Sequence, residues 1–367
     1  MIVIADDITG AAEIAGIAFS QGQQVRLVCG GAVYGCDTAI YGTTVIATDT
    51  RSMSEGEAVA ETLRIASLLS PHSSFLFKKT DSALRGHVVA ELKALMQATG
   101  CQRTVYLPAN PSKGRIIRNG VYYIKEVRGE QGEVSEVPIA ETAFNYDPEF
   151  PAKTSALEER FPDAKAHNII MPDAESEEDI RRVIATYNDG KTLFAGAADL
   201  FALLVEQETR GTKKEESTEA YSRENTLILC GSTQSRPLKL GIPLSPMPRA
   251  VYDGSSDLSL WDTTAYSQHH NLILTIPHTH RTGKAAAVHL RTTMAEMARR
   301  LVSLHCPSHL IIEGGATAWA TLQALGWTQF EVVRQAAPGV VQMKSVTTGT
   351  LVTLKPGSYP WGALFRQ

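Results

Sequence analysis

The chain has 367 residues, a formal net charge of −4, 43% hydrophobic residues and 20% charged residues. This length predicts two domains that each bury a core, and the composition is that of an ordinary soluble globular protein. The sequence contains no basic block, which argues against nucleic acid as the main partner. No apolar run approaches membrane-spanning length. The five cysteines form no C-x-x-C pair and the chain opens without signal-peptide features, so we expect free thiols and a cytoplasmic protein.

The first ten residues carry the clearest signal. Residues 1–5 form an apolar run typical of a buried strand, and Asp6 and Asp7 follow it directly. A helix-compatible stretch over residues 11–20 comes soon afterwards. Open α/β sheets build ligand sites where a strand ends in polar residues and turns into a helix, whose first N–H groups favour an anion. The alternative interpretation is that Asp7 or Thr9 serves only as a helix N-cap.

Short apolar runs alternate with helical periods along most of the chain, which predicts an α/β fold with mainly parallel sheets and flanking helices. Residues 206–224 break this rhythm, because ten of the nineteen residues are charged. We interpret them as a linker between a first domain over 1–205 and a second over 225–367, with the ligand site in the cleft between the domains. The expected strands are 1–5, 25–28, 44–47, 75–77, 105–107, 227–230, 310–312 and 351–354; the expected helices are 11–20, 55–69, 88–96, 284–303 and 318–325; and a loop is expected over 108–120.

Four polar clusters follow four expected strands of the first domain. Because parallel strands all end at one edge of a sheet, we expect the clusters to converge there. Their mixture of acids and bases fits a small polyhydroxy acid, whose carboxylate would contact Arg and Lys and whose hydroxyls would contact carboxylates. Taken singly, Arg51 would be a surface salt bridge and Arg85 an ion pair at a helix start. The clusters are Asp6 and Asp7; Asp49 and Arg51; Lys79, Asp81, Ser82 and Arg85; and Asn110, Lys113, Arg115, Arg118 and Asn119.

Three strands of the second domain end in loops rich in Gly, Ser and Thr. Glycines let a backbone approach a phosphate, and the N–H groups at helix starts supply donors. One such loop alone would be a simple turn, but three in one domain favour a phosphate site. At Gly315 we expect a positive φ angle. The segment 278–284 is not a P-loop, and the four histidines between 269 and 280 lack zinc-site spacing. The loops are 231–233, 314–317 and 355–358.

These motifs resemble those of the four-carbon acid sugar kinases, once catalogued as a domain of unknown function. The opening I-A-D-D-I-T-G-A is similar to the family's A-D-D-x-T-G-A signature, and residues 78–86 are similar to its K-K-x-D-S-T-L-R-G segment. Residues 108–120 are similar to its P-A-x-P-x-x-G-R…N-G loop. The resemblance extends over nearly the whole chain. It implies an N-terminal acid-sugar-binding domain, a C-terminal ATP-binding domain, and phosphorylation of the terminal hydroxyl of threonate, erythronate or 3-dehydrotetronate.

The resemblance also implies roles for particular residues. Asp81 or Asp7 would orient or deprotonate the attacking hydroxyl. Lys79 and Arg85 would anchor the carboxylate or stabilise the transferring phosphoryl group. Mg²⁺ would bridge the ATP phosphates, and we expect Glu313 or water to coordinate it in place of the missing acid. The implied substrate contacts are Asp7, Arg51, Lys79, Thr80, Asp81, Ser82 and Arg85, and the implied ATP contacts are Ser232, Gly314, Gly315, Ala316, Thr317 and Gly357.

The second domain departs from the family pattern at two places. Ala316 stands where the family usually has an acid, and residues 355–360 read K-P-G-S-Y-P in place of K-x-G-N-F-G. A non-catalytic sugar-acid sensor with a degraded nucleotide site is therefore one alternative function, and a phosphatase or isomerase that uses the acidic pair is another. The expected partners are a sugar acid and ATP, without nucleic acid or membrane. The stereoisomer, the identity of the general base and a homodimeric state stay open.

Overall fold

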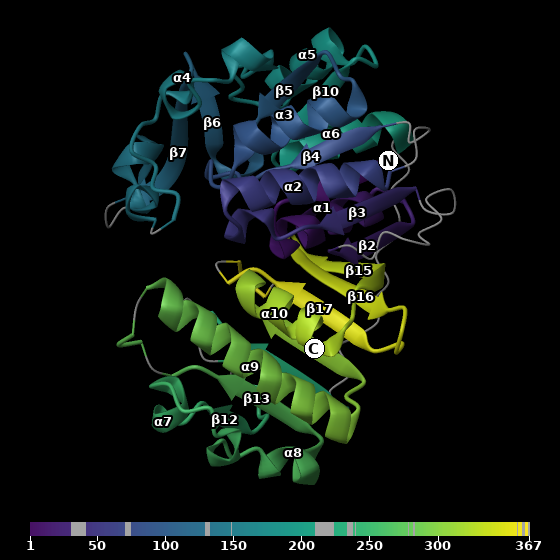
Figure 1. Cartoon of the computed structure of the whole chain (residues 1–367), viewed down its shortest axis with the longest axis vertical. Helices are drawn as coiled ribbons and strands as arrows, with labels where there is room; N and C mark the ends of the chain where they lie inside the picture. Colours follow the sequence, from purple (N-terminus) through teal and green to yellow (C-terminus); the bar gives the residue numbers. More distant parts are fainter. Residues whose placement is uncertain are drawn as a thin grey trace. The chain divides into compact units, whose positions relative to one another are not determined.

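The computed structural model describes residues 1–30, 42–69, 75–128, 133–147, 149–209, 224–232, 238, 240–277, 279–281, 283–357, 359–361 and 364–365. The chain divides into two compact units, one of Met1–Ile14 and Val33–Thr212 and the other of Ala15–Ala32 and Lys213–Gln367. Each unit contains a sheet with flanking helices (Figure 1). The α/β class expected from the sequence is therefore confirmed. Most of the linker expected at 206–224 lies outside the described residues.

The sheet of the first unit consists of β1 (Ile2–Ala5), β3 (Thr43–Ala47), β4 (Leu76–Lys79), β5 (Arg103–Leu107), β9 (Ile169–Ile170) and β10 (Thr192–Gly196). Its strands are all parallel and follow the order β3-β1-β4-β10-β5-β9. Every residue of β1 is buried, as expected for a strand covered by helices on both faces. Because the strands share one direction, the residues after β1, β3 and β4 emerge at a single edge.

The helices of the first unit are α1 (Ile8–Ser20), α2 (Glu55–Ser67), α3 (Val88–Thr99), α4 (Leu157–Arg160), α5 (Glu177–Tyr187) and α6 (Ala198–Thr209). The division between the units falls inside α1. This helix begins at Ile8 and not at residue 11 as expected, because the Asp7 carboxylate accepts the Gly10 N–H at 2.9 Å and so caps the first turn. A capping box between Ser54 and Glu57 starts α2. Helices α2 and α3 pack side by side (Figure 1).

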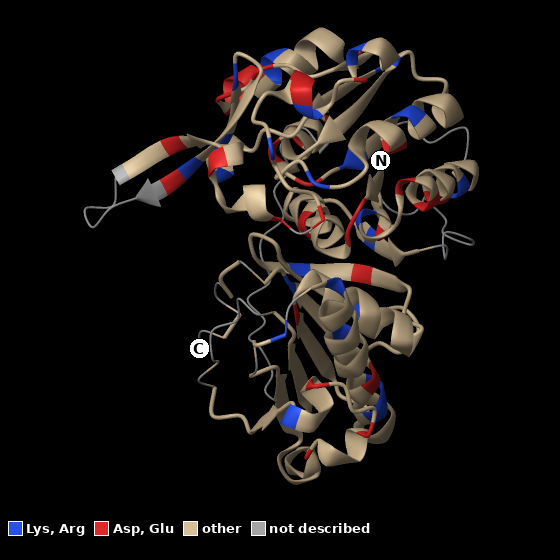
Figure 2. Ribbon diagram, turned by 60° about the vertical axis from the view of Figure 1, so that its left-hand side comes forward, with Lys and Arg blue, Asp and Glu red and all other residues tan. Residues whose placement is uncertain are grey.

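A small antiparallel sheet of β6 (Arg115–Arg118), β7 (Val121–Arg128) and β8 (Glu133–Pro138) is also part of the first unit. The ribbon of β7 and β8 extends from the body of the unit (Figure 2). The sequence predicted a loop over 108–120, and this prediction is wrong over β6. Only Ile116 and Ile117 are apolar in that strand, so no periodic pattern reveals it. Its strand structure depends on pairing with β7, where Ile116 lies opposite Tyr123.

The sheet of the second unit consists of β2 (Val25–Cys29), β11 (Thr226–Cys230), β12 (Leu244–Pro246), β13 (Asn271–Thr275), β14 (His309–Glu313), β15 (Gln329–Ala337), β16 (Val340–Ser345) and β17 (Leu351–Lys355). Their order is β12-β13-β11-β14-β17-β16-β15-β2. In this order the pairs β12-β13, β13-β11, β11-β14 and β14-β17 are parallel. The pairs β17-β16, β16-β15 and β15-β2 are antiparallel. The sequence pattern revealed β2, β11, β14 and β17 but not β12, β13, β15 or β16. In β15, apolar and charged residues mix and the register shifts.

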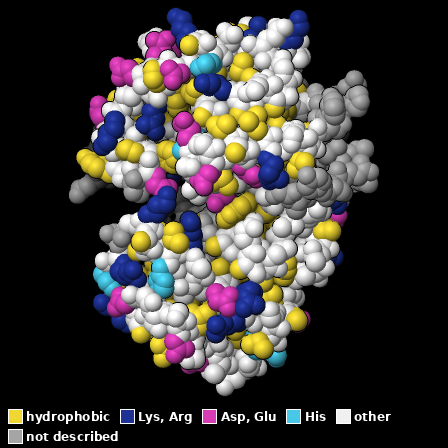
Figure 3. All heavy atoms as spheres, viewed as in Figure 1, with side chains coloured by type: hydrophobic (Ala, Val, Ile, Leu, Met, Phe, Trp, Pro, Cys, Tyr) yellow, Lys and Arg dark blue, Asp and Glu magenta, His cyan; other side chains and the backbone are white. Residues whose placement is uncertain are grey.

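The helices of the second unit are α7 (Arg249–Tyr252), α8 (Thr264–His269), α9 (Lys284–His305) and α10 (Gly315–Leu325). Helices α9 and α10 pack together in front of the sheet (Figure 1). Gly326 ends α10 in the left-handed conformation, at φ 66°, as expected from the sequence. On the face shown in Figure 3, cationic and anionic side chains are interspersed. None of the helices in the described ranges has the length and apolar character of a membrane span.

A buried ion pair joins the helices of the first unit to its sheet. The side chains of Lys78 on β4 and Glu91 on α3 form this pair, and both residues are at most 1% exposed. The Glu91 Oε2 atom also accepts hydrogen bonds from the hydroxyls of Thr50, at 2.8 Å, and Thr62, at 3.2 Å. Thr50 lies in the turn after β3 and Thr62 lies on α2. One carboxylate therefore connects two helices, a strand and the turn that carries Arg51.

Replacing one member of this pair will destabilise the protein far more than replacing both. Glu91→Leu leaves a buried ammonium group without its partner, and we expect it to lower the free energy of unfolding by about 3–5 kcal/mol. Lys78→Met combined with Glu91→Leu removes both charges and should recover most of that loss. Urea unfolding measures each variant, with Glu55→Leu at an exposed position of α2 as the control. A double variant as unstable as Glu91→Leu would contradict this account.

Candidate active site

Arg51 joins three carboxylates at the edge of the first unit's sheet. Its Nε and Nη2 atoms each donate to an oxygen of Asp6 at 2.9 Å, and Nη2 lies 3.1 Å from Oδ1 of Asp7. Its Nη1 atom lies 3.5 Å from Oδ1 of Asp81. We call these four residues the Arg51 cluster. They follow β1, β3 and β4, which are neighbours in the sheet, so the structure brings together parts of three predicted polar clusters.

The acids of the Arg51 cluster differ in proton affinity because their surroundings differ. Burial raises the pKa of Asp6, and the Arg51 guanidinium offsets this only in part. Burial also acts on Asp7, but the nearby cations, Arg51 first, outweigh it and lower its pKa. Burial is likewise outweighed at Asp81, where Arg51 and Arg85 hold the pKa well below its usual range. Asp7 and Asp81 are therefore ionised at neutral pH.

The loop after β4 folds back on Asp81. Arg85 donates to both carboxylate oxygens of Asp81, at 2.8 and 2.9 Å, and the Ala83 N–H donates to Oδ2 at 2.9 Å. Gly86 ends this loop with a left-handed backbone, at φ 96°. A Cβ atom at Gly86 would lie 3.2 Å from Oδ2 of Asp6. Glycine therefore lets the loop lie close against the Arg51 cluster, where Asp81 is saturated by protein donors.

Asp7 caps α1 and faces the Arg51 cluster at the same time. Its Oδ1 atom accepts the Gly10 N–H and also contacts the guanidinium group, while the Thr9 hydroxyl donates to Oδ2. The N-cap interpretation and the site interpretation of the sequence thus describe the same side chain. The Asp7 side chain is 17% exposed, compared with 3% for Asp6 and 10% for Asp81. Asp7 is therefore the acid of the cluster that solvent or substrate reaches most readily.

Lys79 lies between this cluster and a second group of charges. Its Nζ atom donates to the Thr80 carbonyl oxygen at 2.9 Å and lies 3.6 Å from Oε2 of Glu13, which also pairs with Lys113. The side chain of Thr80 is buried, and its hydroxyl lies near that of Tyr106. Sequence reasoning did not single out Glu13. The available signal was the single acid of a mostly apolar helix, and Glu91 is likewise the single acid of α3.

The fourth predicted cluster divides between the site and the surface. Arg115 lies at the site, where its Nη1 atom donates to the Ser82 hydroxyl oxygen. Arg118, on the same strand, pairs with Glu136 and Glu175 at the surface. The sequence alone could not separate these two arginines, because the pairing of β6 with β7 decides which way each one points. Away from the Arg51 cluster, Asn110 contacts Asp199, Asn119 contacts Asp173 and Asp49 contacts Ser52.

In the second unit, glycines bring loops into close contact at the ends of the parallel strands β11, β14 and β17. A Cβ atom at Gly231 would lie 2.0 Å from Oγ1 of Thr317, and a Cβ atom at Gly357 would lie 2.2 Å from Oγ of Ser232. Both distances are far shorter than a van der Waals contact, so a larger residue would force the loops apart. Thr233, His278 and Ser358 lie outside the described residues.

Helix α10 begins directly after β14. Gly314 is its N-cap, at φ 99°, and as a glycine it contributes no capping side chain. The positive φ expected at Gly315 therefore occurs at Gly314. The first N–H groups of a helix have no partner within it, and its dipole favours an anion. Ala316 lies in this first turn, while Thr317 is buried with its side chain against Gly231.

A buried ion pair between Glu313 and Lys355 supports these loops. The Lys355 Nζ atom also donates to the Gly357 carbonyl oxygen at 3.2 Å and lies 4.9 Å from the centroid of the Trp361 ring. Burial and the neighbouring Glu313 raise the pKa of the Cys230 thiol to about 12. The Glu313 carboxylate is thus already paired with the Lys355 ammonium group. Within the described ranges, no group of three or more His, Cys, Asp or Glu side chains could hold a metal ion.

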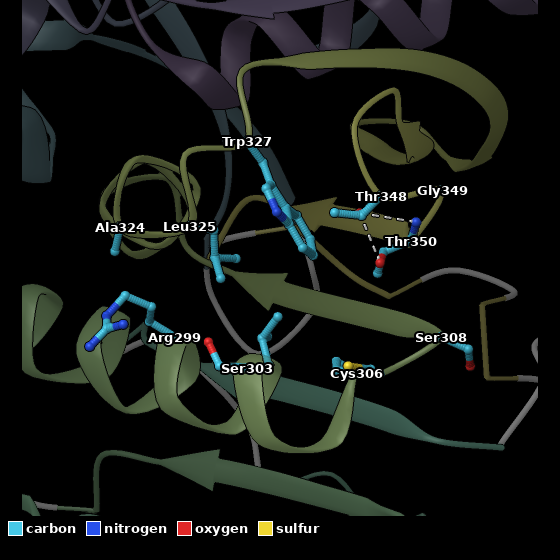
Figure 4. Close-up of a pocket in the computed structure, with 12 residues that line it drawn as sticks. Arg299, Ser303, Cys306, Ser308, Ala324, Leu325, Trp327, Thr348, Gly349 and Thr350 are labelled. Atoms are coloured by element: carbon cyan, nitrogen blue, oxygen red, sulfur yellow. Dashed lines mark hydrogen bonds between the residues drawn. The ribbon is translucent and has the colours of Figure 1, made fainter.

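A pocket of about 650 Å³ lies elsewhere in the second unit (Figure 4). Ser308, which precedes β14, and Thr350, which precedes β17, line it together with Trp327. The pocket is thus located where these strands begin, whereas the glycine loops follow their ends. It is therefore distinct from the phosphate site expected at the glycine loops.

Two family models match the chain. A sugar-binding N-terminal domain matches residues 1–166, and a nucleotide-binding C-terminal domain matches residues 260–359. The first match contains the Arg51 cluster, and the second contains the loops around Gly314 and Gly357. The two kinds of site in the structure thus coincide with the two kinds of domain in the family.

Two curated kinases and one solved structure are similar to this chain, and two of these three cover nearly all of it. The 3-oxo-tetronate kinase of Haemophilus influenzae is 25% identical over 402 residues, which cover 97% of this chain and 96% of that protein. The D-threonate kinase of Bordetella bronchiseptica is 33% identical over 165 residues, which cover 42% of this chain and 37% of that protein. A Haemophilus influenzae crystal structure, from a domain family of unknown function, shares the fold with a TM-score of 0.73 and 21% identity, covering 100% of this chain and 98% of that one. The chain therefore belongs to the four-carbon acid sugar kinase family.

Proposed function

We propose that this protein is an ATP-dependent kinase that phosphorylates the terminal hydroxyl of a four-carbon sugar acid of the threonate, erythronate or 3-oxo-tetronate type. One observation carries the proposal. The Arg51 cluster lies in the part that matches a sugar-binding domain, and the loops around Gly314 and Gly357 lie in the part that matches a nucleotide-binding domain. Relatives that align with nearly the whole chain are named 3-oxo-tetronate kinase, which supports the same reaction.

Asp7 is the acid best placed to accept a hydrogen bond from the attacking hydroxyl. It is the most exposed acid of the Arg51 cluster, whereas the oxygens of Asp81 are taken by Arg85 and the Ala83 N–H. Its lowered pKa makes Asp7 a weak base. Phosphoryl transfer through a loose transition state, however, depends more on positioning and charge than on proton removal. Asp7 would therefore orient the hydroxyl, and Lys79 would place positive charge beside it.

The phosphates of ATP would bind at the start of α10. The N–H groups of the first helical turn would supply donors, and Gly231 and Gly357 let the neighbouring loops lie close to one another beside it. The Ser232 hydroxyl lies at the same place, against Gly357. These contacts use the backbone, so they do not require the acid that Ala316 replaces.

Mg²⁺ is expected to accompany ATP, but the described residues do not form a protein site for it. The Glu313 carboxylate pairs with Lys355, and no cluster of potential metal ligands occurs within the described ranges. In proteins this ion commonly keeps several waters and is held through substrate phosphates. We therefore assign Mg²⁺ no ligand in this chain and derive no catalytic step through it.

A coupled ADP-release assay tests the proposed function. Wild-type protein with MgATP should release ADP in the presence of threonate, erythronate or 3-oxo-tetronate, and not in their absence. Thermal shift should show separate stabilisation by the sugar acid and by MgATP; a ligand at 100 times its Kd stabilises by about 2.7 kcal/mol. Binding of an acid without nucleotide binding at millimolar MgATP would overturn the kinase proposal in favour of a sensor. Phosphate release without ATP would favour a phosphatase.

The two acids nearest the proposed hydroxyl site should affect different kinetic constants. We expect Asp7→Asn to lower kcat by about 10²-fold, because the acceptor that orients the hydroxyl is lost. Asp81→Asn should chiefly raise KM for the sugar acid, because the loop after β4 loses the carboxylate that holds Arg85 and the Ala83 N–H in place. Steady-state ADP release measures both constants. The reverse pattern would assign the hydroxyl-orienting role to Asp81.

Substitutions at the two ends of α10 separate nucleotide binding from helix stability. Gly314→Val should abolish the thermal shift produced by MgATP, because a β-branched residue resists a positive φ and would project into the phosphate space. Gly326→Ala, which strains the left-handed cap at the other end of the helix, should lower Tm yet keep the MgATP shift. Ala316→Asp should increase MgATP affinity or turnover. A Gly314→Val variant that retains the wild-type shift would exclude this helix start as the phosphate site.

A further inference from the structure

Arg115 differs from the other arginines at the site in the groups that it contacts. Its Nη1 atom donates to the Ser82 hydroxyl oxygen, and its Cζ atom lies 5.7 Å from the centroid of the Phe144 ring. Among the described residues, no Asp or Glu oxygen lies within ion-pair distance of its guanidinium group. Of the three arginines at this site, Arg115 therefore has the positive charge that nearby acids neutralise least.

The other two arginines are already neutralised by the protein. Arg51 contacts the three acids of its cluster, and Arg85 donates to both oxygens of Asp81 and lies 3.6 Å from Asp147. A substrate carboxylate that approached either arginine would meet these acids at close range, and like charges repel. The carboxylate of a sugar acid therefore has a more favourable partner in Arg115.

The surroundings of Arg115 hold its guanidinium group in a fixed position. The Phe144 ring lies within cation–π distance of both Arg115 and Arg85, at 5.7 and 5.9 Å from the ring centroid. The Tyr122 hydroxyl donates to the Ser82 carbonyl oxygen at 2.5 Å, which fixes the residue that accepts from Arg115. A guanidinium group held in this way offers two parallel donors to a carboxylate.

We propose that Arg115, assisted by the Ser82 hydroxyl, binds the carboxylate of the sugar acid and so sets the preference for acids over neutral sugars. This inference rests on the proposed function, and it adds a specificity-determining residue to it. Ser82 follows Asp81 directly, and Asp81 contacts Arg51. The carboxylate end of the substrate thus lies beside the Arg51 cluster and leaves Asp7 for a hydroxyl.

The experiment compares an acid with its neutral amide. Threonate and threonamide have the same carbon chain, so a partner of the carboxylate affects the first and not the second. Arg115→Met should raise the Kd and KM for threonate by about 10- to 100-fold, the effect of losing a hydrogen-bonded charge pair, and leave those for threonamide nearly unchanged. Arg115→Lys, which keeps the charge without the planar fork, should fall between Arg115→Met and wild type.

Arg118→Met is the matched control, because Arg118 lies on the same strand but pairs with Glu136 and Glu175 at the surface. It should bind both ligands as wild type does. Calorimetry without nucleotide gives the Kd values, and Tm verifies that each variant is folded. If Arg115→Met is unfolded, the comparison of threonate with threonamide is made on Arg115→Lys. Equal losses for threonate and threonamide, or no loss for either, would overturn the assignment. The binding comparison needs no turnover, so it tests the role of Arg115 alone. ADP release by the wild-type protein tests the proposed kinase function separately.

Discussion

One largely buried guanidinium group determines the geometry of the sugar-binding unit. The Arg51 side chain is 16% exposed and contacts acids that follow different parts of the sheet edge. Leaving one member of a buried ion pair unpaired costs far more than losing an exposed pair, so these contacts hold the loops after β1, β3 and β4 together. They fix the direction of Asp7, and they also fix Asp81, which in turn orients Arg85. The arrangement of the whole site depends on this shared charge.

Under the proposed function, the two units would bind anions in different ways. The first unit uses side-chain charges, most of which are neutralised within the protein, so selectivity depends on the few groups that remain less paired. The second unit uses backbone N–H groups at the start of α10, and glycines such as Gly231 and Gly357 keep the loops close. Backbone N–H donors bind phosphate whatever the identity of most neighbouring side chains. Backbone donors of this kind do not require an acid at position 316, whereas the proposed site of the first unit depends on charged side chains.

The sequence located the polar residues at the edge of the sheet, but it did not show which charged side chains pair with one another. Polar residues directly after an apolar run mark the end of a strand, and this rule identified Asp7, Arg51 and Asp81. Sequence reasoning placed Lys79 and not Lys78 in the polar cluster, but it did not reveal that Lys78 pairs with Glu91. Adjacent residues of a strand point to opposite faces, so Lys78 reaches Glu91 while Lys79 lies near Glu13.

Short strands and exact helix starts were also beyond the sequence pattern. Strand β6 has only two apolar residues, and its structure comes from pairing with β7. The sequence therefore could not show that Arg115 lies at the site while Arg118 pairs with acids at the surface. The positive φ angle expected at Gly315 occurs at Gly314, because the position of the helix N-cap depends on where β14 ends. Tertiary pairing decides each of these features, and local sequence carries little information about it.

A crystal structure with threonate bound tests the central claim that Arg51 organises the site and does not itself hold the substrate carboxylate. The account predicts that Arg51 keeps both of its 2.9 Å hydrogen bonds to Asp6. It also predicts that a substrate hydroxyl lies within hydrogen-bond distance of Asp7. A structure in which the carboxylate of the acid replaces Asp6 or Asp81 at the Arg51 guanidinium would contradict it.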